Sequence, residues 1–222
     1  MNAPNALSTA RAAAAESTKL QPAGAPGHRA QFYESDEFPC EAVTDFLLEG
    51  LRQGEALFVI ASDGHRDAIA RRLEANGFHA GAHGQTPSIT FLEATEALST
   101  FMTGSMLDEV RFKSSIGQAI ERSRGRQQSL RTCGEMVDLL CREGNHAAAI
   151  RVEELWDELV RTHSISLLCT YSIDNFGKES ETPAFHEVCS LHSQVIPAKT
   201  GAAVDEDVRA REICHLQQRA RV

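Results

Sequence analysis

The residues Ser62-Asp63-Gly64-His65-Arg66 stand where a phosphate-binding loop would stand, directly after the strand-like apolar run 57–61. A working phosphate loop of the GxxxxGK[ST] type needs backbone amides around the phosphates, a Lys that reaches the terminal ones and a Ser or Thr that holds magnesium. The Lys and the magnesium-binding hydroxyl are missing from this turn. The sequence therefore predicts the strand, turn and helix of a nucleotide-binding unit without its chemistry.

His65 and Arg66 fall in the first turn of the helix that we expect after this strand. The N-terminus of a helix already carries positive potential, so cations there are unfavourable unless something offsets them. An anionic or carbonyl-bearing ligand could do so, as could Glu135 from across the sheet, and exposure to solvent is the plainer explanation. Glu135 itself resembles the acidic residue that follows a strand in NTPases, although it equally suits the start of a helix.

The elements that must position these residues alternate along the chain. Apolar runs predict strands at 30–33, 57–61, 88–92, 129–133 and 166–171, and helical spacing predicts helices at 39–52, 65–76, 94–102, 108–124, 135–143, 146–161 and 183–193. This alternation predicts an α/β fold with a mostly parallel sheet and helices on both faces.

Rings and polar groups follow several of the predicted strands. In an open parallel sheet, ligands bind outside the carboxyl ends of the strands. We therefore predict a ligand-binding crevice formed by Tyr33, His65, Arg66, Glu135 and Tyr171. Such a lining suits a small, mostly apolar molecule with one polar end. Polar residues are common at the strand ends of any α/β sheet, so a surface without a pocket is the alternative.

A metal site and a catalytic site are both disfavoured by the sequence. The motif His186-xx-Cys189-xx-His192 has steps of three, which spread the side chains over roughly 120° of a helix, too far to meet one ion without a further ligand. Cys189 also belongs to an apolar row. The chain has no GxSxG or HExxH motif. We expect a protein that is not an enzyme and that uses no cofactor.

The composition of the chain indicates where the protein is located in the cell and which partners it does not bind. The net charge of −9 over 222 residues opposes binding to the phosphate backbone of a nucleic acid, so direct nucleic-acid binding is disfavoured. No apolar run approaches the roughly 18 residues of a membrane span, and the N-terminus lacks the apolar core of a signal peptide. Six cysteines without a CxxC pair suit free thiols in a reducing compartment. These features predict a cytoplasmic protein.

The N-terminal and C-terminal segments differ in composition from the middle of the chain. Residues 1–27 are rich in Ala, Pro and Gly, and we expect them to be disordered. Near the other end, a polar helix is predicted at 204–220 with a thin apolar strip of Ile213, Leu216 and Ala220. Such a strip suits a helix for dimerisation or signalling, or a surface helix docked on its own domain.

Motifs spread through residues 28–197 resemble the MEDS domain, the sensory module of methanogens, methylotrophs and the dichloromethane-responsive repressor. The matching motifs keep their order along the chain: His28-xxx-Phe32-Tyr33, Phe46-Leu47-xx-Gly50-Leu51-xx-Gly54-Glu55-Ala56, His65-Arg66, Arg111-Phe112, Gly134-Glu135-Met136-Val137, Gly144-Asn145, Glu153-Glu154-Leu155-Trp156 and Ser166-Leu167-Leu168-Cys169-x-Tyr171. The resemblance implies a degenerate RecA/KaiC-like core without a usable phosphate loop. It also implies a sensor of simple hydrocarbon derivatives that works with a histidine kinase or a transcription regulator.

Residues 198–222 resemble the start of the linker helix that leads into a kinase in such proteins, and no output domain is recognisable after Pro197. We therefore expect a stand-alone sensory domain that binds a small organic ligand and signals through a partner protein or as a homodimer. The alternative is a nucleotide-binding protein or weak NTPase with an atypical phosphate site at His65 and Arg66.

Overall fold

The core of the fold is one parallel sheet of six strands. The computed structural model describes residues 26–34, 37–78 and 89–198. The strands run in the order β3-β2-β6-β7-β1-β8, and every neighbouring pair is parallel. Their bounds are β1 (Gly27–Tyr33), β2 (Ala56–Ala61), β3 (Ile89–Glu93), β6 (Leu130–Gly134), β7 (Ile165–Ser172) and β8 (Gln194–Ile196). Every residue of β2 and β7 is buried, and β2 is apolar along its whole length, as is typical of strands covered on both faces.

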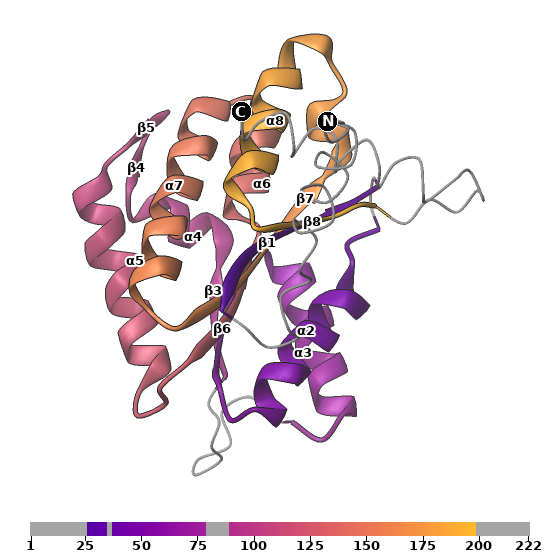
Figure 1. Ribbon diagram of the computed structural model, residues 1–222, viewed down its shortest axis with the longest axis vertical. Coiled ribbons are helices and arrows are strands. Elements are labelled where there is room, and N and C mark those ends of the chain that lie inside the picture. Colours follow the sequence, from indigo (N-terminus) through magenta and orange to yellow (C-terminus); the bar gives the residue numbers. More distant parts are fainter. Residues whose placement is uncertain (1–25, 35–36, 79–88, 199–222) are drawn as a thin grey trace, which may run out of the picture.

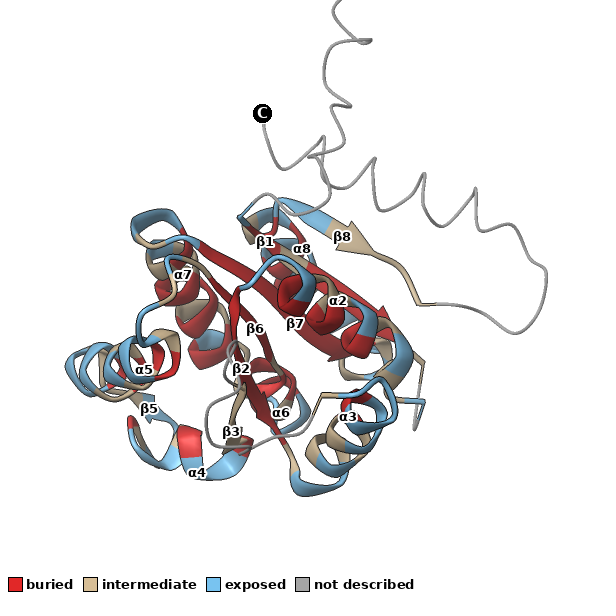
Figure 2. Cartoon of the chain, turned by 90° about the horizontal axis from the view of Figure 1, so that it is seen from below, coloured by how far each residue is buried: buried red, intermediate tan, exposed pale blue. Residues whose placement is uncertain are grey.

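Helices cover both faces of this sheet (Figure 1). One face is packed by α2 (Cys40–Arg52) and α3 (Asp63–Ala75). The other face is packed by α4 (Ala94–Ser99), α5 (Glu109–Arg124), α6 (Met136–Arg142), α7 (His146–Thr162) and α8 (Thr182–Leu191). Viewed along the sheet, the buried strands form a band between two helical layers (Figure 2). The predicted α/β fold with a parallel sheet covered on both faces is confirmed.

Each helix buries one face because its apolar residues recur at helical spacing. In α2, Val43, Leu47 and Leu51 are buried against the sheet while Asp45 and Arg52 stay exposed. In α7 the buried stripe includes Val152 and Trp156, whose ring meets Phe112 of α5 edge-on at 5.9 Å.

A buried ion pair fastens the end of α2 to the sheet. The Arg131 guanidinium of β6 is 1% exposed, and its Nε donates to Glu55 Oε2 at 2.5 Å. Its Nη1 donates to the Phe46 carbonyl at 2.9 Å, and the group lies over the Phe46 ring. A Cβ at Gly50 would stand 2.8 Å from Arg131 Cδ and 2.9 Å from Glu55 Oε2. Gly50 is therefore the residue that lets this pair pass beneath the helix.

The predicted elements agree closely with the observed ones, with a few differences. β1 begins at Gly27, the last residue of the segment that we expected to be disordered, and α4 ends at Ser99 rather than at 102. The chain then forms a short hairpin, β4 (Met102–Thr103) and β5 (Met106–Leu107), which turns at Gly104 with a φ of 59°. Neither this hairpin nor β8 was predicted, because two or three residues carry too little periodicity. Residues 1–25 and the predicted helix 204–220 lie outside the described residues.

None of the helices in the described part of the chain is long and apolar enough to cross a membrane.

Candidate functional site

A pocket of about 670 Å³ opens at the carboxyl ends of the central strands. Neighbouring strands supply it from different points of the sequence, because β2, β6, β7 and β1 lie side by side. It is lined by Tyr33 at the end of β1, Phe38 before α2, Ser62 and His65 at the β2–α3 turn, Arg142 at the end of α6, Ser172 at the end of β7, and Asp174 and Asn175 in the 3-10 turn Ile173–Phe176.

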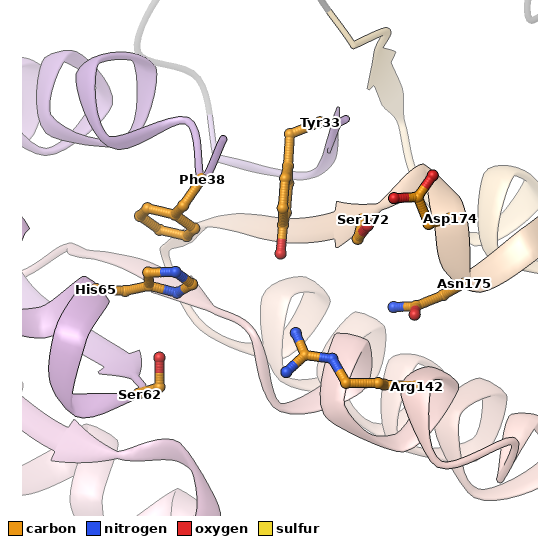
Figure 3. Close-up of a pocket in the computed structure, with 8 residues that line it drawn as sticks. All are labelled: Tyr33, Phe38, Ser62, His65, Arg142, Ser172, Asp174 and Asn175. Atoms are coloured by element: carbon orange, nitrogen blue, oxygen red, sulfur yellow. The ribbon is translucent and has the colours of Figure 1, made fainter. Parts of the chain in front are cut away.

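Tyr33 stands in the middle of the pocket, between two different walls (Figure 3). Phe38 and His65 form one wall, with their rings stacked at 3.8 Å between centroids and 12° between planes. Ser172, Asp174 and Asn175 form the opposite wall. Arg142 reaches toward the centre from α6. A ligand here would meet rings on one side and hydrogen-bonding groups on the other.

The carboxylate of Asp138 connects the polar wall of the pocket to Tyr33 and Arg142. It is 1% exposed. Its Oδ1 accepts from the Ser172 N–H at 2.7 Å and from Asn175 Nδ2 at 2.6 Å, and its Oδ2 accepts from Arg142 Nη2 at 2.9 Å and from the Tyr33 hydroxyl at 3.4 Å. Burial raises the pKa of Asp138 above its usual range, and the Ser172 N–H and Arg142 offset part of that effect. One side chain thus fixes four groups of the pocket.

A second buried carboxylate, Glu135, holds the first wall. Its Oε2 lies 2.5 Å from His65 Nδ1, and its Oε1 accepts the Ser62 N–H at the start of α3. Burial disfavours the charged form of Glu135, but the bonds from His65 and Ser62 outweigh it and hold its pKa below the usual range. The N-terminus of a helix favours a nearby anion, and at α3 the buried carboxylate of Glu135 takes that position.

The structure brings together some of the predicted site residues and separates others. Tyr33 and His65 line the pocket, and Glu135 lies 3% exposed behind His65. Arg66 is not in the pocket lining; its Nη2 lies 2.8 Å from the exposed Asp63 of the same helix.

Tyr171 is a correction to the predicted site, since it does not line the pocket. It is fully buried on the other face of the sheet, stacks on Phe32 and donates its hydroxyl to Glu153. The strand runs one residue beyond the predicted end, and side chains alternate between the faces, so Ser172 faces the pocket instead.

Sequence reasoning missed Phe38, Asp138, Arg142 and the residues of the 3-10 turn. Phe38 and Asn175 carry no local signal, because loops bring them to the pocket. Asp138 did carry one: it is an acidic residue between Val137 and Leu139 in a short, otherwise apolar helix, with Arg142 four residues later on the same side. A charge in that position has to find partners when the helix packs on the sheet.

Three comparisons with known proteins show which family this chain belongs to. A solved structure of a protein from Pyrococcus horikoshii OT3 is similar over 80% of this chain and 84% of that chain, with 8% sequence identity and a TM-score of 0.46. Such a weak likeness supports no conclusion about function. The comparison with curated proteins gives no significant match. The model of the MEDS family, the MEthanogen/methylotroph, DcmR Sensory domain, matches residues 27–193. The match spans β1 to the end of α8 and includes every residue that lines the pocket, so the chain belongs to the MEDS family of sensory domains.

Proposed function

We propose that this domain is a sensor without catalytic activity, and that its pocket binds a small organic molecule with an apolar body and one polar or anionic end. The observation that carries the proposal is the pocket itself, with stacked rings on one wall and Arg142 and Asn175 held in place by Asp138 on the other. The rings suit the apolar body of the ligand, and the guanidinium and amide suit its polar end. A pocket whose polar groups are already held by buried carboxylates loses little entropy when it binds.

The position of the pocket supports a signalling role. Its walls belong to separate segments: the connection between β1 and α2, the turn before α3, the end of α6 and the turn after β7. A ligand that contacts several of them favours the arrangement in which all contacts are made. We propose that another cytoplasmic protein, such as a histidine kinase or a transcription regulator, or a second copy of this chain, responds to that arrangement.

The pocket can be tested with small probes that match its chemistry. We suggest methanol, dichloromethane, acetate and benzoate, titrated into ¹⁵N-labelled protein and followed by amide chemical shifts. A bound probe should shift the amides of Ser62, His65, Ser172 and Asn175 and leave those of α5 unchanged. Shifts centred on α5 instead would place the binding site elsewhere.

The first prediction compares two arginines. Arg142→Ala should weaken binding of a carboxylate probe about 10- to 100-fold, because a hydrogen bond to a charged group contributes about 1.5 to 3 kcal/mol. Arg66→Ala is the matched control, since Arg66 is one-third exposed, paired with Asp63 and outside the pocket lining. Calorimetry on both variants gives the comparison. Weaker binding in Arg66→Ala and unchanged binding in Arg142→Ala would contradict the site proposed here.

The second prediction concerns nucleotides. We expect no tight ATP binding and no magnesium-dependent phosphate release above a buffer blank. The turn before α3 has neither the Lys nor the Ser or Thr after the glycine that phosphoryl transfer requires. The Glu135 carboxylate also takes the Ser62 amide and faces any phosphate that would approach. A turnover that disappears in His65→Ala would favour the alternative function, a weak NTPase.

A further inference from the structure

Four potential metal ligands converge on the opposite face of the sheet from α2 and α3. They are His28 of β1, Glu153 of α7, Cys169 of β7 and His192 directly after α8. One donor atom from each lies within 4.8 Å of all the others, and all four residues are buried. None of them lines the pocket. The cluster is thus separate from the proposed sensory site.

Three separations between donor atoms lie in the range of a tetrahedral site. Bonds of about 2.0 to 2.3 Å give a tetrahedron with edges of about 3.3 to 3.8 Å. His28 Nε2 lies 3.4 Å from Cys169 Sγ, Cys169 Sγ lies 3.6 Å from Glu153 Oε2, and His192 Nε2 lies 3.7 Å from Glu153 Oε2. A fourth separation, from His28 Nε2 to Glu153 Oε2, is 2.9 Å and would have to widen by several tenths of an ångström.

The geometry of His192 favours a cation at this cluster. Its Nδ1 lies 2.6 Å from the Val188 carbonyl, which can only accept, so the assigned tautomer carries the proton on Nδ1. The lone pair of Nε2 then faces the carboxylate of Glu153. This buried Nε2 has no hydrogen-bond partner among the described residues. Two acceptors that face each other in the protein interior repel, and a cation between them removes that repulsion.

Outer partners hold two of the four ligands, His192 and Glu153. Ligand histidines in metal sites usually give their other ring nitrogen to a carbonyl or carboxylate. The Val188 carbonyl serves His192 in this way. The Asp157 carboxylate faces His28 Nδ1 at 3.9 Å, which is beyond hydrogen-bond distance. The second oxygen of Glu153 accepts the Tyr171 hydroxyl. Tyr171, which we had expected in the pocket, thus orients a ligand of the cluster.

We propose that His28, Glu153, Cys169 and His192 bind one Zn²⁺ ion. Two imidazoles, one thiolate and one carboxylate form a donor set that Zn²⁺ accepts in tetrahedral coordination. The two anionic ligands also neutralise the ion, so the buried site carries no net charge. Four protein ligands leave no open position, which makes the site structural and ties the segment after α8 to the first strand.

The cluster shares one residue with the motif that we disfavour as a metal site from the sequence. Of His186, Cys189 and His192, only His192 reaches the cluster, while His186 is exposed and Cys189 packs in the core. From the sequence we expect no metal site, because steps of three spread these side chains around the helix. The other ligands of the cluster come from strands and a helix far away in the sequence.

The test uses the full-length, tag-free chain. Protein freed of metal with a chelator is titrated with Zn²⁺ against a chromophoric competitor and, separately, with Co²⁺. We expect one ion per chain, visible bands of tetrahedral Co²⁺ and a near-ultraviolet charge-transfer band from a single thiolate. Zn²⁺ should also raise the melting temperature, because it binds the folded state.

Matched variants locate the ion. Losing an outer partner alone costs about 10- to 100-fold in metal affinity, so losing a ligand in Cys169→Ser should cost at least about 100-fold and abolish the charge-transfer band. Cys189→Ser and His186→Gln, which alter the same residue types outside the cluster, should bind as the wild type does. If Cys169→Ser does not fold, His192→Gln takes its place. Absence of stoichiometric binding by the wild type, or equal binding by the ligand variants, overturns the proposal.

Discussion

Trp156→Ala should lower the free energy of unfolding by about 3 to 5 kcal/mol, the range for truncating a large aromatic side chain in a packed core. The indole is 1% exposed and packs against Phe112, so its removal leaves a cavity between α7 and α5. Urea unfolding of the variant and the wild type gives the difference directly.

Val110→Ala provides the control for that experiment. Val110 is 78% exposed at the start of α5, and its truncation should change stability by no more than about 0.5 kcal/mol. If Trp156→Ala loses as little as this control, Trp156 does not belong to the core of the folded protein in solution.

Glu55→Gln should cost about 3 to 5 kcal/mol of stability, because it leaves the buried guanidinium of Arg131 without its counter-charge. The exposed pair of Glu49 and Arg52 in the same region offers a matched control, and Glu49→Gln should cost less than about 1 kcal/mol. Denaturant unfolding of both variants measures the contrast.

The double variant Glu55→Gln/Arg131→Met tests whether the unpaired charge of Arg131 causes the loss of stability in Glu55→Gln. With the orphaned charge removed, it should be more stable than Glu55→Gln alone. If the two substitutions instead destabilise additively, the two side chains are not coupled and the ion pair does not explain the loss.

The fold could be predicted from the sequence because its main signals are local. The uninterrupted apolar run in β2 and the buried spacing in α2 and α7 each identify their element without knowledge of the rest. The topological rule for parallel sheets predicts a crevice at the carboxyl ends of the strands, and the structure has a pocket there, with Tyr33, His65 and Glu135 near one another.

The details of the site could not be predicted in the same way. Strand ends are uncertain by a residue or more, and a shift of one residue exchanges the two faces, which is why Tyr171 was expected where Ser172 lies. The buried cluster depends on long-range pairing, since His28 and Cys169 are 141 positions apart. No spacing rule joins residues across such a distance.

The order of strands also has a consequence for how the chain is made. β1 is synthesised first, yet both of its neighbours in the sheet, β7 and β8, come last. At about 5 to 20 residues per second, roughly 7 to 26 s pass between the end of β1 and the start of β7. During that interval β1 has no strand to pair with, and its unpaired edges can recruit other chains. A nascent chain interrupted before β7 should therefore aggregate rather than persist as a partial domain.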